Sequence, residues 1–426
     1  MNLRKKAVLA AGTLLRRDFR AIAGAFGGGE RGGLAVLNDR LVKARRLLPE
    51  YDAACAAALK GSGALASMED FRRLPLMGRA ELAAYSGRGA LASLKSGGTG
   101  SAGHVETRLD TGAVAARYAA LLAVLETAGW RMGDKTAALH PREYAFFENL
   151  PARLAAGKFG GALFEFFQQY LLYRLVHNRK NVYYGGGIFS SPEAALALAE
   201  AAASERPVLL ITRPDALMAV LRALRGRALP GFDRLKAVLT VGTALGDTVR
   251  AEAQERLGAE AFNMYASTEL GYVALSCPRS NGWLHADQAG HILERAGDGE
   301  LVCTDLDNAL APVLRYRTGD IGELAEGVCA CGTRGPLLKF RGRKDRFTDA
   351  AGGRLYEAEL IDRVFGTGLP FFQLDAASSS ILLPPGAGEK EAAAVREALG
   401  LLPGAYGAVG AGNLKISASG KFCFLP

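Results

Sequence analysis

Short apolar runs alternate with helix-like segments in the middle of the chain, and this alternation limits the possible folds more than any other feature. Residues 207–212 and 237–241 are β-branched or leucine-rich, and a helix-like sequence follows each of them. Parallel strands need long crossover connections, which a helix between consecutive strands supplies. The pattern therefore predicts an α/β fold with parallel strands, and residues 300–304 form a further predicted strand.

Helical patterns come before this region. The spacing of apolar residues predicts helices over residues 36–48, 79–84 and 112–128, and a helical turn at 68–76 that breaks at Pro75. Pro49 is predicted to end the first helix, and Gly129 is placed to cap the last one.

The pattern of predicted elements changes after Arg343. A glycine turn at 352–353 is followed by a predicted helix, a strand and a second helix, at residues 357–365, 380–383 and 390–402. This segment is large enough for a small α+β domain. We therefore expect a large N-terminal α/β domain, residues 1–341, and a small C-terminal α+β domain, residues 342–426.

The composition is that of an ordinary globular protein, with 49% hydrophobic and 22% charged residues in 426. The formal charge of +9 comes from scattered Lys and Arg without interleaved aromatic residues. This argues against nucleic-acid binding and is compatible with an anionic cofactor. No apolar run reaches the length of a membrane span. Six cysteines are too few for a disulfide scaffold, so we expect a cytoplasmic protein.

The N-terminus carries the one segment that could be a targeting signal. Basic residues at 4–6 precede a short apolar stretch at 7–15, and Arg16 and Arg17 follow where small residues would mark a cleavage site. We therefore expect an amphipathic surface helix in place of a signal peptide.

A glycine-rich stretch lies upstream of the predicted parallel strands: Ser96, Gly97, Gly98, Thr99, Gly100 and Ser101. Glycines let the backbone approach a ligand closely, and the three hydroxyls can donate hydrogen bonds to phosphate oxygens. The stretch predicts a phosphate-binding loop, with a flexible surface turn as the alternative.

Two further motifs follow in the sequence. Tyr265-Ala266-Ser267-Thr268-Glu269 offers a hydroxyl for a phosphate and a carboxylate for Mg²⁺, which prefers hard oxygen ligands. Taken alone, this motif is also typical of a strand end with residues that cap a helix. The segment 315–320 ends in Asp320, whose carboxylate can bridge two ribose hydroxyls. Together the three motifs predict a nucleotide site assembled from distant loops.

In their order and separation, these motifs resemble the adenylate-forming superfamily, which includes acyl-CoA synthetases and peptide-synthetase adenylation domains. The resemblance runs from about residue 36 to Lys421, and it is strongest to the phenylacetate-CoA ligase branch because of Leu74 and Pro75 before the loop. It implies that ATP, with Mg²⁺, and a small carboxylic acid form an acyl-adenylate, which a thiol then attacks. It also implies a hinge at Asp345, about which the small domain rotates between the two steps.

The resemblance assigns residues outside the loop to individual roles in this chemistry. The roles are packing near adenine for Tyr265, the α-phosphate for Thr268, Mg²⁺ for Glu269, the ribose for Asp320, ribose or phosphate for Arg343, and the reacting carboxylate for Lys421. A lysine at that last position would offset negative charge as the carboxylate attacks the α-phosphorus.

Several alternatives stay open at this stage. The thiol is expected to be that of coenzyme A, and a carrier protein or a protein cysteine is the alternative acceptor. Gly98 stands where the superfamily usually has threonine, and no lysine follows the loop, so a nucleotide-binding relative without activity is a second alternative. The chain could also form a homodimer.

Three cysteines and a histidine predict a separate metal site. Cys277 and His285 lie eight residues apart, and Cys329 and Cys331 form a second close pair. Three thiolates and one neutral imidazole suit a closed, structural Zn²⁺ site, and similar positions occur in the branch named above. The alternative is that the cysteines are small buried hydrophobic residues. Cys303, inside a predicted strand, is expected to lie in the core.

Aromatic residues gather in three places that could form the acid pocket or belong to the core. They are Tyr144, Phe146 and Phe147, then Phe164, Phe166 and Phe167, and finally Tyr183 and Tyr184 before three glycines. As a pocket lining, they predict an aromatic or other apolar acid.

Overall fold

The structure is a computed structural model, and the residues that it describes form several ranges. These are 33–85, 90–95, 106–141, 151, 155, 157, 166, 172–174, 176–224, 227, 229–369, 371–402, 404–410, 414–417 and 420–426. The glycine-rich loop at 96–101 and the N-terminal segment lie outside the described residues. So do Tyr144, Phe146, Phe147, Phe164 and Phe167.

The chain divides into two compact units, and each unit combines segments that are distant in the sequence. The first unit comprises residues 1–127, 145–176 and 265–339, and the second comprises 128–144, 177–264 and 340–426. One cut falls between Lys339 and Phe340, next to the predicted boundary after residue 341. Residues 340–426 are part of the second unit, together with 128–144 and 177–264, so a separate, rotating C-terminal domain stays a prediction.

Parallel strands form the centre of the second unit, in the order β4-β3-β5-β6-β7. They are β3 (Thr136–His140), β4 (Arg179–Tyr183), β5 (Leu209–Thr212), β6 (Ala237–Val241) and β7 (Glu260–Ser267). The last three residues of β7 belong to the first unit. The α/β prediction is confirmed, and the two strands expected at 207–212 and 237–241 are β5 and β6.

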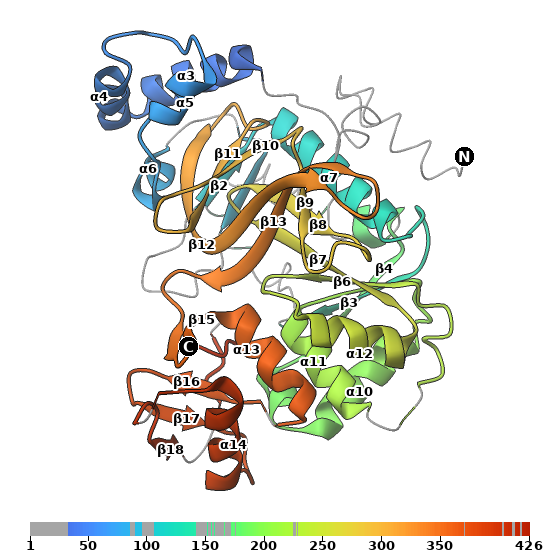
Figure 1. The fold of residues 1–426 in the computed structure, drawn as a ribbon. Coiled ribbons are helices and arrows are strands. Elements are labelled where there is room, and N and C mark those ends of the chain that lie inside the picture. The colour runs from blue at the N-terminus through green and yellow to red at the C-terminus, as the bar shows by residue number, and fades with distance from the viewer. Residues whose placement is uncertain are drawn as a thin grey trace. The chain divides into compact units, whose positions relative to one another are not determined.

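Three helices connect these strands and lie side by side in Figure 1: α10 (Pro192–Ala203), α11 (Pro214–Ala223) and α12 (Asp247–Leu257). Proline at the first position helps to start both α10 and α11, because the missing N–H has no partner there in any helix. Gly258 ends α12 in the left-handed conformation that a side chain would strain. A short 3-10 helix, η2 (Gly186–Phe189), follows β4.

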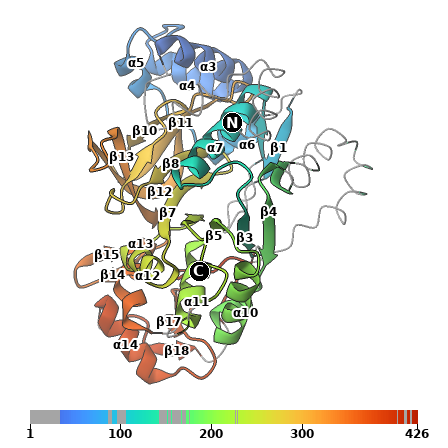
Figure 2. The ribbon, with the colours of Figure 1, turned by 90° about the vertical axis from the view of Figure 1, so that its right-hand side faces the viewer.

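The C-terminal part of the second unit contains two small sheets and two helices. A hairpin of β14 (Thr348–Ala350) and β15 (Gly353–Leu355) precedes α13 (Glu357–Val364) and η3 (Phe365–Thr367). The second sheet has the order β16-β17-β18, with α14 (Glu389–Leu399) near β17 and β18 in Figure 2. Its strands are β16 (Gln373–Asp375), β17 (Ser380–Leu382) and β18 (Ala408–Gly410). The helices and strand predicted here are confirmed within about three residues.

One apolar core joins this C-terminal part to the helices of the second unit. Phe189 of η2 packs against Phe422 and Phe371, with ring centroids 4.7 and 5.3 Å apart. Arg222 of α11 lies over the Phe371 ring, 4.6 Å from its centroid. These aromatic residues are buried in the same cluster as the helix residues, so burial of apolar surface holds them together.

The first unit begins with helices: α3 (Leu34–Leu47), α4 (Pro49–Ala58), α5 (Met68–Arg73), α6 (Arg79–Ala84) and, later, α7 (Thr111–Thr127). The predicted helices and the turn before Pro75 are confirmed. The prediction that Pro49 ends the first helix is confirmed, and Pro49 is also the first residue of α4. Proline stops one helix and starts the next, since its fixed φ suits a first turn.

Antiparallel strands complete the first unit, in the order β10-β11-β12-β13-β9-β8, with a separate β1–β2 hairpin. The main strands are β8 (Gly271–Ser276), β9 (Leu284–Ala286), β10 (His291–Arg295), β11 (Glu300–Asp305), β12 (Val313–Val328) and β13 (Arg334–Arg343), and the hairpin is β1 (Ala92–Lys95) and β2 (Glu106–Leu109). Cys303 lies in β11 and is fully buried, as expected. Within the described ranges, no helix is long and apolar enough to cross a membrane.

Candidate active site

A tight turn between β7 and β8 carries two of the predicted site residues, Thr268 and Glu269. The turn is closed by the Ser267 hydroxyl, which accepts a hydrogen bond from the N–H of Leu270 at 3.1 Å. Gly271 then begins β8 with a φ of +83°. No helix starts here, so the alternative of a helix cap is wrong.

Side-chain donors hold three consecutive carbonyl groups of this turn. Arg117 of α7 donates from Nη1 to the Thr268 carbonyl at 2.9 Å and from Nη2 to the Glu269 carbonyl at 2.6 Å. The imidazole Nε2 of His291 lies 3.0 Å from the Leu270 carbonyl. A Cβ at Gly271 would lie 3.0 Å from the Arg117 side chain, so glycine leaves room for this arginine. The turn is therefore fixed by its backbone, and the Thr268 and Glu269 side chains are left for other partners.

The two donors are cations placed against buried carboxylates. Arg117 Nη2 lies 3.5 Å from Asp305, and His291 Nδ1 lies 3.4 Å from Asp287. Burial lowers the pKa of His291, but the hydrogen bond and charge of Asp287, with the charge of Asp305, outweigh burial and raise the pKa to about 9. His291 is thus a buried imidazolium at neutral pH. Sequence reasoning missed these four residues, because each lies alone in a helix, strand or loop.

Tyr265 and Asp320 meet inside the first unit. The Tyr265 hydroxyl donates to Asp320 Oδ2 at 2.7 Å, although the residues are 55 positions apart in the sequence, and both side chains are buried. Burial and the Asp320 carboxylate hold the pKa of Tyr265 well above its ordinary value, so the phenol stays a donor. The backbone N–H of Asp320 donates to the Thr318 hydroxyl at 3.1 Å. The motif at 265–269 is thereby tied to the motif at 315–320.

Glu269 is the candidate Mg²⁺ ligand. Its side chain is 6% exposed, and within the described part of the chain its carboxylate makes no hydrogen bond. Carboxylate oxygens are hard ligands of the kind that a divalent cation such as Mg²⁺ prefers. The residue therefore fits the predicted metal.

Lys421 lies in the second unit, at the ends of the parallel strands. Its backbone N–H donates to the Ser417 hydroxyl at 2.9 Å. The preceding Gly420 has a φ of +73°, and a Cβ there would lie 3.0 Å from Pro141, the residue after β3. Burial and then the Arg213 guanidinium lower the pKa of Lys421, against a smaller opposing effect of Asp215. The lysine is therefore close to a buried ion pair that the sequence did not reveal.

Arg343 ends β13 and belongs to the second unit. Its Nε lies 3.9 Å from Asp345, the predicted hinge residue, and both side chains are partly or largely exposed. This contact does not test the predicted role at ribose or phosphate.

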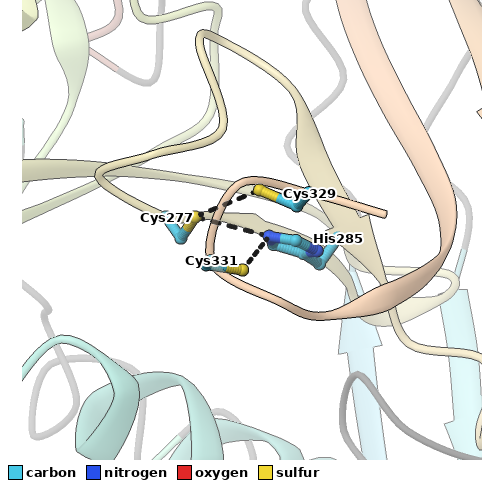
Figure 3. A group of neighbouring side chains, drawn as sticks. All are labelled: Cys277, His285, Cys329 and Cys331. Atoms are coloured by element: carbon cyan, nitrogen blue, oxygen red, sulfur yellow. Dashed lines mark hydrogen bonds between the residues drawn. The ribbon is translucent and has the colours of Figure 1, made fainter. Parts of the chain in front are cut away.

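The three cysteines and the histidine predicted to bind zinc do come together. Figure 3 shows the four side chains pointing toward one another, with Cys277 after β8, His285 in β9, and Cys329 and Cys331 between β12 and β13. All four ligand atoms lie within 4.8 Å of one another. The Cys277 and Cys329 sulfurs are 3.7 Å apart, and His285 Nε2 lies 3.4 Å from Cys277 Sγ and 3.5 Å from Cys331 Sγ.

The three distances just given are close to the edges of a zinc tetrahedron. With Zn–S bonds of about 2.3 Å and a Zn–N bond of about 2.0 Å, two sulfurs are about 3.8 Å apart and a sulfur and a nitrogen about 3.5 Å apart. Burial lowers the pKa of His285, which keeps the imidazole neutral and able to bind a metal. Burial raises the pKa of Cys277 to about 11, and a metal ion would offset that effect by stabilising the thiolate.

Comparisons with known proteins establish the fold. No model of a protein family matches the chain, and no curated protein matches it in sequence. Among solved structures, the chain shares its fold with a 2-hydroxyisobutyryl-CoA ligase. A 2-hydroxyisobutyryl-CoA ligase in the postadenylation state, in complex with 2-HIB-AMP, superposes with a TM-score of 0.63 at 16% identity, over 91% of this chain and 86% of that one.

A second structure of that ligase matches less closely. In complex with 2-HIB-AMP and CoA in the thioesterification state, it gives a TM-score of 0.55 at 18% identity, over 86% of this chain and 83% of that chain. Likeness at this identity shows the fold, and the chemistry must be argued from the site itself.

Proposed function

We propose that the chain is an AMP-forming acid–thiol ligase, which activates a carboxylic acid as an acyl-adenylate and transfers the acyl group to a thiol. The observation that carries this proposal is the buried hydrogen bond from Tyr265 to Asp320. It joins two motifs that the resemblance places at adenine and at ribose, and it does so beside the turn that holds Thr268 and Glu269. A nucleotide site built from distant loops needs such a link.

In the first half-reaction, a carboxylate oxygen attacks the α-phosphorus of ATP and pyrophosphate leaves. The hydroxyl of Thr268 would donate to the α-phosphate, and the Lys421 ammonium would lie by the attacking carboxylate. Glu269 would hold Mg²⁺, which neutralises charge on the phosphates. Arg117 and His291, which together donate to the carbonyl groups of the turn and are called the clamp below, would keep the turn in one geometry before the nucleotide binds. Binding then does not have to order the turn.

In the second half-reaction, a thiolate attacks the acyl carbon and AMP leaves. Coenzyme A is the proposed thiol, and complexes of the 2-hydroxyisobutyryl-CoA ligase with CoA support it by fold. A carrier-protein thiol remains the alternative acceptor, since both acceptors present the same nucleophile.

We further propose one structural Zn²⁺ per chain, held by Cys277, His285, Cys329 and Cys331. The spacing of the four ligand atoms supports a closed tetrahedral site. Four protein ligands leave no position for substrate, so the metal would connect the β8–β9 segment to the loop between β12 and β13.

Exchange of labelled pyrophosphate into ATP tests the proposed activity. An adenylate-forming enzyme catalyses this exchange only when its acid is present, because the first half-reaction must run backwards from the acyl-adenylate. We expect acid-dependent exchange with at least one member of a broad acid panel, with omission of Mg²⁺ as a control. Absence of exchange with every acid, from a protein that binds ATP, would favour the nucleotide-binding relative without activity.

A further inference from the structure

A glutamine is buried between apolar neighbours in the C-terminal part of the second unit. Gln373 begins β16, and its side chain is fully buried together with the adjacent Phe372 and Leu374. A buried amide is costly unless its polar atoms are hydrogen-bonded, and a methionine would fill the same space without that cost. The hydrogen-bond partners of Gln373 therefore indicate what its amide does.

These partners are backbone groups on the two sides of Lys421. The Nε2 of Gln373 donates to the Lys415 carbonyl at 2.7 Å and to the Cys423 carbonyl at 2.9 Å. Its Oε1 accepts from the Lys415 N–H at 2.6 Å. A side-chain amide has two N–H donors and one acceptor oxygen, so both of its polar atoms are engaged. A single side chain thus joins the backbone before Lys421 to the backbone after it.

The residues next to Lys421 add further contacts. The Ser417 N–H donates to the Lys421 carbonyl at 3.0 Å, and the Lys421 N–H donates to the Ser417 hydroxyl at 2.9 Å. After the lysine, Phe422 and Phe424 are both buried, with ring centroids 4.9 Å apart. The Phe424 carbonyl accepts from the N–H of Leu374 in β16 at 2.9 Å. The backbone of Lys421 is therefore held from both directions along the chain.

The ammonium group of Lys421 takes no part in these contacts. Among the described residues, it makes no hydrogen bond and no ion pair. The contacts fix the point from which the lysine side chain starts and leave its ammonium for a ligand. In the proposed first half-reaction this ammonium must lie by the attacking carboxylate, and a misplacement of about 1 Å can cost about 100-fold in rate.

We propose that Gln373 is a positioning residue for Lys421, and that its amide, by holding Lys415 and Cys423, keeps the Lys421 ammonium where the carboxylate of the acid attacks ATP. The inference rests on the proposed function, in which Lys421 serves the first half-reaction. Gln373 itself would contact neither the acid nor the nucleotide, because all its hydrogen bonds go to backbone groups of the chain. Its removal should therefore change the rate of the chemical step and leave ATP binding as it was.

Gln373→Met tests this role by acid-dependent pyrophosphate exchange. Methionine is close to glutamine in size, and it can make none of the hydrogen bonds to Lys415 and Cys423. We expect kcat for exchange to fall about 10- to 100-fold, because the ammonium is no longer held in one place. The KM for ATP should change by less than about threefold, since Lys421 is assigned to the acid.

Combination with Lys421→Ala separates positioning from a general loss of structure. If Gln373 acts through the Lys421 ammonium, Gln373→Met should lower exchange by less than about twofold in a protein that already carries Lys421→Ala. If Gln373 acts on the fold as a whole, the two losses should multiply. Losses that multiply, or exchange by Gln373→Met at the wild-type rate, would overturn the inference while leaving the ligase activity standing.

Val249→Ala is the control for stability, because this buried residue of α12 lies in the same unit and its truncation weakens the core. It should unfold at a lower temperature and exchange at the wild-type rate.

Ser417→Ala is a second variant, to be used if Gln373→Met does not fold. It removes the acceptor of the Lys421 N–H, so exchange should fall by about threefold or more, with no further loss beside Lys421→Ala. Exchange by Ser417→Ala at the wild-type rate would then overturn the inference. Absence of exchange by the wild type with every acid would overturn the proposed function, and the inference with it.

Discussion

The turn after β7 and the strand edge around Lys421 use their charged side chains in opposite ways. In the turn, the cations Arg117 and His291 donate to backbone carbonyls, and the carboxylates Asp305 and Asp287 lie behind them. At the strand edge, Arg213 donates hydrogen bonds to Asp215, and nearby donors have no hydrogen-bond partner among the described residues. The first arrangement fixes a backbone shape, whereas the second leaves donors for a ligand.

This difference predicts which substitutions should lower the stability of the fold and which should change catalysis. Removing a cation from the turn removes the partner of a buried carboxylate and frees carbonyl groups that have no other donor among the described residues. Removing a donor at the strand edge leaves the folded chain largely as it was, since that donor serves no other protein group.

The largest effect is expected at Lys421. Lys421→Ala removes the one ammonium proposed to offset charge on the attacking carboxylate, so pyrophosphate exchange should fall about 100- to 1000-fold. Binding of ATP, followed by titration calorimetry, should change by less than about threefold, because the lysine is assigned to the acid. An exchange rate close to that of the wild type would remove Lys421 from the chemistry.

Arg117 should have the next largest effect, this time on stability. Arg117→Met removes the ion-pair partner of the buried Asp305 and is expected to lower the free energy of unfolding by about 3 kcal/mol, measured in urea. Arg117→Met combined with Asp305→Asn should recover part of the loss, because the buried charge is then removed and one oxygen still accepts from the backbone. Arg131→Met, at an exposed position, is the control. If Arg117→Met is as stable as the control Arg131→Met, the clamp contributes nothing to the free energy of unfolding.

The zinc cluster gives a third prediction within the first unit. Purified protein should contain about one zinc per chain, and Cys329→Ser should lose most of it and unfold about 5 °C lower, since the metal ties two segments together. Cys423→Ser, outside the cluster, should keep the zinc. Metal analysis of the purified protein tests the proposed zinc site. If wild-type protein prepared without chelators contains no zinc, the proposal is wrong.

His291 provides the last prediction, which is tested by pH. Its folded-state pKa of about 9 lies above the ordinary value of 6.5, so the stabilisation is fully present below pH 6.5 and is lost as the pH rises through 9. Between pH 6 and 9.5 the wild type should lose about 3 kcal/mol relative to His291→Gln, in which this titration is absent. If the two proteins show parallel stability curves over this range, the imidazole is neutral and the turn is held without its charge.

Much of the architecture could be predicted from the sequence because its signals are local. The hydrophobic runs at 207–212 and 237–241, the helix ending before Gly129 and the helical turn that breaks at Pro75 each depend on a few neighbouring residues. The zinc set could also be found, since four residues with few other uses stand out. Pro49 marked the end of the first helix, and its second role as the start of α4 was not predicted.

The charged residues that support the site could not be predicted, because their roles depend on partners that are distant in the sequence. Arg117 is one arginine in an alanine-rich helix, and nothing near it in the sequence indicates that it reaches Thr268 and Glu269. Arg213 and Asp215 are two residues apart and resemble an ordinary helix start. Only the fold shows that they lie at the strand edge beside Lys421.

The fate of the carboxylate oxygen tests the central claim most directly. The acid found by pyrophosphate exchange would be labelled with ¹⁸O in its carboxylate and incubated with ATP and coenzyme A, and the nucleotide product would be measured by mass spectrometry. Attack on the α-phosphorus leaves the bridging oxygen on AMP when the thiol displaces it, so the account predicts AMP that carries one ¹⁸O. Label in inorganic phosphate together with ADP, or AMP without label, would contradict it.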